Sequence, residues 1–474
     1  MVELQKAVII DLGGSYTQQI ARMVREKGVY SEIIPCSTAL NEIKKRDAQA
    51  LIISGGPDYC SEEVFSLLDR GVFELGVPVM AVGHGMKVLP GIHGFDTQDM
   101  AEQLSKLHYK NILDGFEAGK DSPGASVPLL GTFLLPGKQS GRNLLEYFLF
   151  DVAGLKATWS PASFVEHAVK AIRAAISEDA HAVCGLSGGI DSVVAALLVY
   201  RAIGDRLTCI FVDHGLMREG EAQQVIEIYR QKYNLPVVMV DAATEFIEKL
   251  KGVTDPEEKR RVIGEHFIRV FEREAGYLEG VEYLVQGTIY PDIIESISPS
   301  GETIKSHHNV GGLPEKMHLK LIEPIKELFK DEVRNVAEIM GLPADIVWRQ
   351  PFPGPGLGVR ILGEVTKEKI KIVRRANAIV EEEVEKEGLT YSLWQCFAIL
   401  PEIRSVGIDK GKRTYAHSII LRAVTSRDAM TAEWYHFSHD FLDRLAKRII
   451  KEIPEVNRVL YDITSKPPAT IEWE

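Results

Sequence analysis

The chain has 474 residues, of which 45% are hydrophobic and 26% are charged, and its formal net charge is −12. This composition is typical of a soluble globular protein, and the length indicates about three domains. The negative charge argues against a nucleic-acid or membrane partner. Five separated cysteines without a CxxC pair argue against a disulfide framework or a zinc site. The sequence shows no signal peptide and no apolar run of about 18 residues, so we predict a cytoplasmic protein.

Residues 1–152 alternate predicted strands with helical segments, which indicates a parallel sheet with functional loops after the strands. The predicted strands are 6–12, 50–54 and 77–82, and a helix is predicted over 16–27. The second strand runs into Gly55-Gly56-Pro57, and the third runs into Gly83-His84-Gly85.

These strands and loops resemble a class I glutamine amidotransferase. In that family a cysteine at the third-strand elbow attacks glutamine, a histidine acts as the base, and a glutamate orients the histidine. Here Gly83 stands at the cysteine position. The segment 131–137 resembles the one that carries the other two residues, and it places Leu135 and Gly137 at their positions. The resemblance therefore predicts a degenerate glutaminase domain, in which the stretch between elbow and residue 131 is also short.

Such a domain predicts ammonia as the nitrogen donor, and two alternatives remain open. Cys60 and His84 are candidates for a rewired nucleophile and base, although a lone cysteine or histidine is more often structural. A separate glutaminase that docks on the chain is the other source of ammonia.

The middle of the chain contains a glycine-rich motif, His-Ala-Val-Cys-Gly-Leu-Ser-Gly-Gly-Ile-Asp-Ser, at residues 181–192. The apolar run predicts a buried strand, Ser187-Gly188-Gly189 predicts a tight turn, and helical spacing begins at Ser192. This arrangement directs backbone N–H groups and the positive end of a helix at one point, which suits a phosphate. It lacks the lysine of a Walker A loop.

The motif resembles the N-type ATP pyrophosphatases, in which this loop holds the departing pyrophosphate. Further strands are predicted at 207–213, 236–242 and 281–288, and ligands bind at the carboxyl ends of such strands. A carboxylate beside a phosphate loop needs a cation, so Asp191 predicts a Mg²⁺ site. We expect ATP to contact these residues: Ser187, Gly188, Gly189, Ile190, Asp191, Ser192, Val193, Val212, Asp213, Gln286, Gly287 and Thr288.

Two later segments, 287–296 and 304–313, are separated by a turn-rich stretch and form a candidate lid. Together with 255–261 they resemble the guanosine monophosphate synthetases. The resemblance implies adenylation of xanthosine monophosphate (XMP) by ATP, followed by displacement of AMP by ammonia. It also implies catalytic roles for Asp292, Glu295 and Lys305.

By the same resemblance, Arg260 contacts XMP. His307 and His308 are also assigned to substrate binding. As a pair of metal ligands they are disfavoured, because adjacent side chains point apart. The alternatives are an adenylating amidase of the NAD synthetase type and a nucleotide-binding regulator without catalysis.

The remaining residues resemble the carboxyl-terminal domain of the same family, which forms dimers and helps to bind XMP. The Pro- and Gly-rich loop 350–360 is predicted to present Arg360 to a phosphate or base. The tail contains prolines, an isoleucine and a tryptophan, so we expect it to be packed in a pocket where Lys466, Ile471 and Glu472 bind the nucleotide.

Several elements are predicted in this region: helices at 326–340, 366–386 and 429–452, and strands at 396–400, 415–424 and 459–463. The run Glu381-Glu382-Glu383 is interpreted as solvated surface. The overall prediction is an α/β protein with three domains: 1–152 (amidotransferase-like), 160–350 (ATP pyrophosphatase) and 351–474 (dimerisation and XMP binding).

Overall fold

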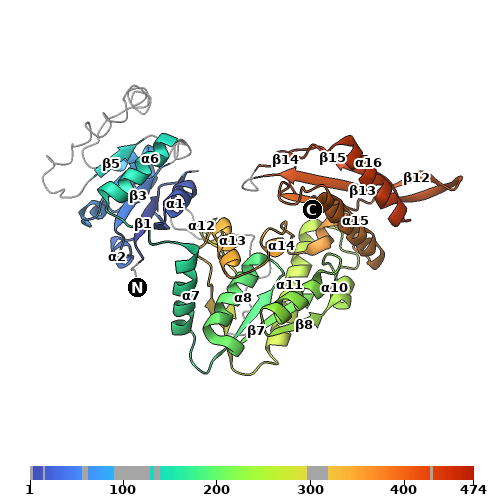
Figure 1. Ribbon diagram of the computed structural model, residues 1–474, viewed down its shortest axis with the longest axis horizontal. Helices are drawn as coiled ribbons and strands as arrows, with labels where there is room; N and C mark the ends of the chain where they lie inside the picture. The colour runs from blue at the N-terminus through green and yellow to red at the C-terminus, as the bar shows by residue number, and fades with distance from the viewer. Residues whose placement is uncertain are drawn as a thin grey trace. The chain divides into compact units, whose positions relative to one another are not determined.

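The computed structural model describes residues 4–13, 16–55, 62–89, 129–132, 139–295, 319–426 and 431–474. The chain divides into two compact units (Figure 1). The first comprises Met1–His167, Ile289–Ser306 and Lys326–Glu332. The second comprises Ala168–Thr288, His307–Ile325 and Val333–Glu474.

The first unit is built on a parallel sheet with the strand order β2-β1-β3-β4-β5. The predicted strands near the start of the chain are present, and β2 and β5 are additional. The sheet has one hydrophobic core on each face. Its elements are β1 (Lys6–Asp11), α1 (Thr17–Glu26), β2 (Tyr30–Pro35), α2 (Leu40–Lys45), β3 (Ala50–Ser54), α3 (Glu62–Leu67), β4 (Val79–Val82), β5 (Leu129–Thr132) and α6 (Gln139–Tyr147).

One of these two cores includes side chains from much later in the sequence. Phe329 is fully buried in it, and Tyr290, at the start of α12 (Tyr290–Glu295), is 6% exposed. The Ile33 N–H of the edge strand β2 donates to the Tyr290 hydroxyl. Arg25 of α1 forms a buried ion pair of 2.6 Å with Glu332. The core of the first unit therefore includes residues that lie far along the sequence from the rest of that unit.

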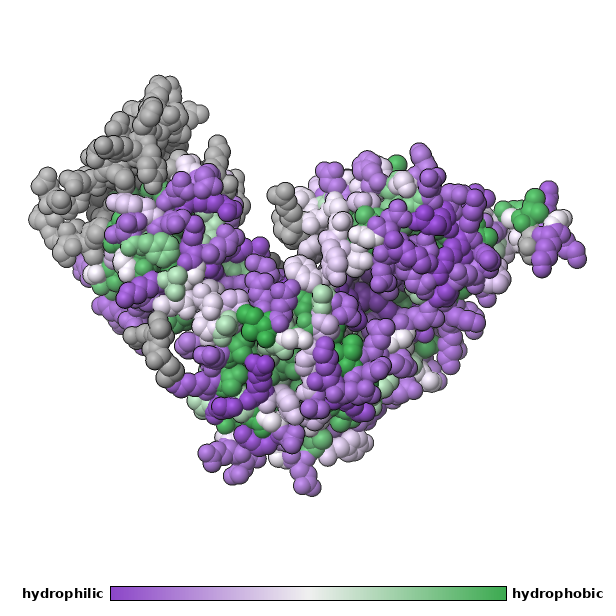
Figure 2. Space-filling view, in the orientation of Figure 1, coloured by the Kyte–Doolittle hydropathy of each residue, from purple (hydrophilic) through white to green (hydrophobic). Residues whose placement is uncertain are grey.

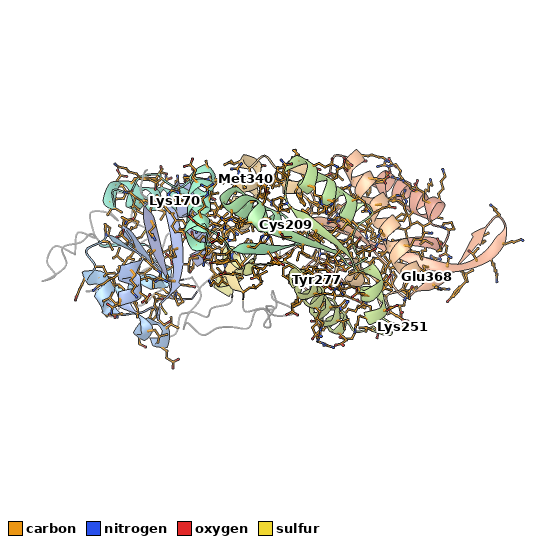
Figure 3. The ribbon with its side chains drawn as sticks, turned by 90° about the horizontal axis from the view of Figure 1, so that it is seen from below. Lys170, Cys209, Lys251, Tyr277, Met340 and Glu368 are labelled. Atoms are coloured by element: carbon orange, nitrogen blue, oxygen red, sulfur yellow. The ribbon has the colours of Figure 1, made fainter. Side chains whose placement is uncertain are left out.

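A second parallel sheet, with the order β10-β9-β6-β7-β8, carries the glycine-rich motif. Its inner strands β6 and β7 are apolar and mostly buried, which is typical of strands covered on both faces. Figure 3 labels Cys209 within β7. The elements are α7 (Pro161–Ala175), β6 (His181–Leu186), α8 (Ile190–Ile203), β7 (Leu207–Asp213), α9 (Glu221–Ile226), β8 (Val237–Asp241), α10 (Ala243–Lys249), α11 (Pro256–Ala275), β9 (Val281–Val285), β10 (Lys320–Ile322), α13 (Lys330–Ile339) and α14 (Ala344–Val347).

The carboxyl-terminal part of the second unit has a mixed sheet in which β13 pairs with β11, β12, β14 and β15. The helices α15 and α16 pack against it, and their apolar faces join the large core of the unit. The α/β fold class with parallel sheets is confirmed. The elements are α15 (Lys367–Lys386), β11 (Gln395–Ile399), β12 (Arg404–Asp409), β13 (Lys412–Thr425), β14 (Glu433–Trp434), α16 (His439–Glu452) and β15 (Val456–Asp462).

The helix predicted over 429–452 is too long. The segment Glu433–Trp434 pairs with β13 as a strand, and α16 begins at His439. Ser438 sets this start, because its hydroxyl accepts a hydrogen bond of 3.2 Å from the Phe441 N–H.

The interpretation of the glutamate run on α15 as solvated surface is wrong for Glu383, which is only 3% exposed. Its carboxylate accepts from Arg444 at 2.8 Å, from Arg448 at 2.8 Å and from Lys386 at 3.0 Å. Burial raises the pKa of Glu383, but hydrogen bonds from these three cations outweigh it, and the net pKa falls to about 2. The carboxylate therefore joins α15 to α16 as an anion.

Candidate nucleotide-binding site

The glycine-rich motif forms the predicted turn between β6 and α8. Gly188 has φ +77°, and α8 begins at Ile190 after Gly189. Two serine hydroxyls organise the turn. Ser187 Oγ accepts from the Gly189 N–H at 3.3 Å, and Ser192 Oγ accepts from the Ser187 N–H at 3.3 Å and donates to the Gly189 carbonyl at 2.9 Å. The first turn of α8, which has N–H groups without partners inside the helix, is thus held at the end of a buried strand.

Gly287 fixes the position of that helix start. A Cβ atom at Gly287 would lie 2.9 Å from the Asp191 carbonyl carbon and 2.9 Å from the Ser192 nitrogen. Only a residue without a side chain allows this approach between backbones. The structure thus brings the predicted segment Gln286-Gly287-Thr288 directly against the glycine loop.

The neighbouring strand β7 ends at Asp213, and His214 follows it on the same rim. Asp213 accepts a hydrogen bond of 2.9 Å from the Gly215 N–H, and Val212 is buried in the sheet. His214 is 5% exposed, and burial lowers its pKa to about 4, so its ring is neutral at physiological pH. Its Nδ1 accepts from the Leu216 N–H at 3.1 Å. The ring therefore braces the loop after β7.

Asp191 lies in the first turn of α8 and is partly exposed beside the loop serines. Among the residues that the structure describes, no group of three or more His, Cys, Asp or Glu side chains is arranged to hold a metal ion. A single carboxylate next to a phosphate loop fits a magnesium ion that takes its other ligands from phosphate oxygens and water.

The predicted catalytic residues are only partly described. Asp292 accepts a hydrogen bond of 3.0 Å from the Ile289 N–H, so it caps the helix α12 on which it lies. Glu295 is the last residue of α12. Lys305, His307 and His308 lie outside the described residues.

The loop 350–360 and the tail meet at a salt bridge between two predicted substrate-binding residues. Arg360, 3% exposed, donates to both carboxylate oxygens of Glu472, at 3.1 and 2.8 Å. Gln395 donates to the same carboxylate at 3.1 Å. The guanidinium also stacks over the Phe397 ring at 3.9 Å. Sequence reasoning placed both charges near the nucleotide but did not foresee that they bind each other.

The tail is packed as predicted. Ile471 is 8% exposed and belongs to a small core with Phe397 and Ile420. Arg422, fully buried, donates to the main-chain oxygens of Thr464, Thr470 and Ile471.

Two further predicted charges have contacts at the tail: Lys466, which belongs to it, and Arg260, which binds it. The Lys466 backbone forms an isolated bridge with Ala432, the residue before β14. The Arg260 guanidinium donates to the main-chain oxygen of Glu474.

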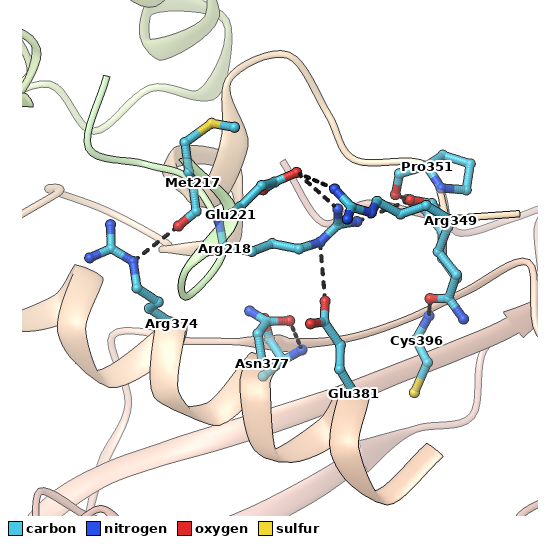
Figure 4. A network of polar contacts seen from close by, with 12 residues as sticks. Met217, Arg218, Glu221, Arg349, Pro351, Arg374, Asn377, Glu381 and Cys396 are labelled. Carbon is cyan, nitrogen blue, oxygen red and sulfur yellow. Dashed lines mark hydrogen bonds and ion pairs between the residues drawn. The ribbon is translucent and has the colours of Figure 1, made fainter. Parts of the chain in front are cut away.

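A polar network that sequence reasoning missed connects the glycine loop to the carboxyl-terminal part of the second unit (Figure 4). Glu221 lies beside the loop, because its Oε1 is 3.6 Å from the position of a Cβ at Gly188. It pairs with Arg218 and Arg349 at 3.4 Å each. Arg218 also pairs with Glu381 of α15 at 3.1 Å. The spacing of these residues in the sequence gives no sign of this contact.

In the first unit, β4 runs into a tight turn at the position predicted for the elbow. Gly83 has φ +61°. The turn is tight, because a Cβ at Gly85 would lie 2.5 Å from the Ile53 carbonyl oxygen. Leu135, Gly137 and Cys60 lie outside the described residues.

A glycine loop between a buried parallel strand and a helix, on a rim that also contacts the tail-bearing part of the unit, is typical of α/β nucleotide-binding proteins. Comparisons with known proteins identify the family. Residues 8–116 match the family described as glutamine amidotransferase class-I, and residues 382–473 match the GMP synthase C terminal domain.

The chain is 47% identical over 511 aligned positions to the GMP synthase (glutamine-hydrolyzing) of Clostridium novyi (strain NT), covering 100% of both proteins. It is 47% identical over 505 positions to the protein of the same name from Natranaerobius thermophilus, covering 98% of this chain and 99% of that one. The chain therefore belongs to the GMP synthase family, and it is a ligase-type enzyme.

Among solved structures, the NH3-dependent NAD synthetase from Campylobacter jejuni matches 49% of this chain and 88% of that chain, with a TM-score of 0.32 and 15% identity. Similarity at this level does not define the activity of the chain. Among the described residues, no helix has both the length and the apolar character needed to cross a membrane.

Proposed function

We propose that this protein converts XMP to GMP with ATP and ammonia. The observation that carries the proposal is the Ser187–Ser192 loop on the rim of the second sheet, in a chain whose tail forms the Arg360–Glu472 cluster. Family membership supports XMP as the substrate. We also propose domain boundaries at 152, 160 and 350, which separate the amidotransferase-like, ATP pyrophosphatase and dimerisation domains.

ATP binds with its terminal phosphates at the glycine loop, where helix N–H groups and the loop serines bind oxygens. Magnesium, held by Asp191 and the phosphates, would neutralise charge on the departing pyrophosphate. The oxygen at C2 of XMP forms a bond to the α-phosphorus as pyrophosphate leaves. Ammonia then forms the C–N bond, AMP leaves with the C–O electron pair, and a proton is released.

We assign the remaining side chains by their chemistry. Arg260, Arg360, Lys466 and Glu472 surround XMP, since guanidinium and ammonium groups suit its phosphate and a carboxylate accepts from purine N–H groups. Ile471 contacts the base. His307 and His308 belong to this group as well.

We propose that Asp292, Glu295 and Lys305 stabilise the transition state of the adenylation step. Charge develops on the transferring phosphoryl oxygens in the adenylation step, and a positioned lysine stabilises it.

Nitrogen comes from free ammonia, because the positions of the glutaminase residues carry Gly83, Leu135 and Gly137. None of these side chains can act as a nucleophile or a base. The relatives are named glutamine-hydrolyzing. The alignment with the first of them spans 511 positions against the 474 residues of this chain, so it includes positions that this chain lacks. Loss of glutaminase activity would therefore distinguish this protein from the relatives it resembles.

We further propose a homodimer formed through the carboxyl-terminal domain. The hairpin of β12 and β13 exposes apolar side chains, which Figure 2 shows at its far tip. Ile408 is 78% exposed, Tyr415 66% and Val406 57%. Apolar residues gathered in this way are typical of a surface covered by a partner. A cytoplasmic location remains a prediction.

The test is an assay of the purified chain with ATP, XMP and magnesium, using ammonium chloride or glutamine as the nitrogen donor. We expect AMP and pyrophosphate with ammonium only, at a rate that rises with pH because only uncharged NH₃ is a nucleophile. No glutamate should form from glutamine. Absence of AMP with ammonium would overturn the proposed reaction, whereas glutamate release would overturn only the proposed nitrogen source.

A further inference from the structure

Lys259 of α11 is buried, and lysine side chains are seldom fully buried unless they are paired. Its side chain is 0% exposed. The Nζ atom donates to the Ile361 carbonyl oxygen at 2.6 Å and to the carboxylate of Glu474. Sequence reasoning assigned no role to Lys259 or to Glu474.

The contacts of Lys259 join the three segments that carry the proposed XMP-binding residues. Arg260 is the next residue on α11, Arg360 precedes Ile361, and Glu472 lies two residues before Glu474. These segments are about 100 residues apart in the chain, and the ammonium group contacts two of them from the third. Together with the direct Arg360–Glu472 and Arg260–Glu474 contacts, this side chain therefore holds the three segments at their mutual distances.

Energetics argue that this pair is not retained for stability alone. Burial is the largest influence on both groups: it lowers the pKa of Lys259 and raises the pKa of Glu474. Removing two charges from water offsets most of their attraction, and apolar residues of similar volume often replace such a pair without loss. What apolar residues cannot reproduce is the directed hydrogen bonding to Ile361 and Glu474.

We propose that Lys259 is a positioning residue for XMP: it fixes Arg260, Arg360 and Glu472 in the arrangement that binds the purine nucleotide. It does not itself contact the substrate. This inference rests on the proposed function. It extends that function, because the affinity for XMP then depends on a buried side chain that does not itself bind the nucleotide.

The test compares Lys259→Met with Lys447→Met in the full-length protein. Lys447 forms a similar lysine–carboxylate pair with Asp443, at 2.6 Å, but its side chain is 76% exposed on α16. We expect Lys259→Met to raise the KM for XMP about tenfold while leaving the KM for ATP unchanged, because sub-ångström misplacement of binding groups is costly. Lys447→Met should change neither constant.

A double variant, Lys259→Met with Glu474→Met, separates positioning from stability. It removes the unpaired carboxylate that the single variant leaves buried, so its thermal unfolding midpoint should recover while the KM for XMP stays high. This variant also decides the question if the single variant does not fold. An unchanged KM for XMP, or an equal rise in the KM for ATP, would overturn the inference. Failure of the proposed function is distinguishable, since the wild-type protein would then form no XMP-dependent AMP.

Discussion

Replacing Gly287 by alanine tests whether backbone packing on α8 sets the geometry of the ATP site. The new Cβ would lie 2.9 Å from both the Asp191 carbonyl carbon and the Ser192 nitrogen. Carbon atoms prefer separations of about 3.5 Å or more, so one of the two segments has to move by about 0.5 Å. Neither backbone atom can rotate away. The first turn of α8 or the end of β9 is displaced as a result.

A misplacement of 1 Å at an active site costs about 100-fold in rate, so half that displacement predicts a loss of about tenfold in kcat/KM for ATP. The assay is XMP- and ammonium-dependent AMP formation at varied ATP, together with thermal unfolding. Gly354→Ala is the matched control, because a Cβ at Gly354 meets nothing within 4 Å. Wild-type kinetics for Gly287→Ala, or an equal loss for Gly354→Ala, would refute the reasoning.

Three further predictions concern charged residues. The pKa of Glu383 is lowered in the folded state from its ordinary value of 4.5 to about 2, so its contribution of about 3 kcal/mol is present above pH 4.5 and lost as the pH falls towards 2. Urea unfolding at stepped pH should show this slope in the wild type and a weaker slope in Glu383→Gln. Arg360→Lys loses the two-pronged contact with Glu472 and the stacking on Phe397, so it should cost about 2 kcal/mol in urea unfolding and raise the KM for XMP. A wild-type KM would contradict the placement of XMP. Asp191→Asn should raise the Mg²⁺ concentration for half-maximal rate by about tenfold, and an unaltered Mg²⁺ titration would exclude Asp191 as a ligand.

The elements that could be predicted from the sequence are those whose residues carry a local signal. Residues 207–213 are mainly apolar and β-branched or aromatic, and β7 has those bounds. The glycine loop was predicted because Ser187-Gly188-Gly189 cannot continue a strand. β12 was missed because Arg404–Asp409 has only two strongly apolar residues and contains a glycine, which favours a loop.

Contacts between distant residues left no such signal. Glu383 looks like solvated surface beside its acidic neighbours, and its partners Arg444 and Arg448 follow some 60 residues later. In the same way, nothing near Arg360 indicates that Glu472 binds it. Burial of a charge is decided by tertiary packing, which composition and spacing do not record.

Phe329 and Tyr290 bear on whether this chain could be divided into two separate proteins. Both rings complete a core whose other buried side chains lie between Ala7 and Leu155. A split of the reading frame after the first domain would leave one product with a hole where two aromatic rings belong, and the other with those rings in water. The core of the amidotransferase-like unit is therefore complete only when the chain continues past Phe329.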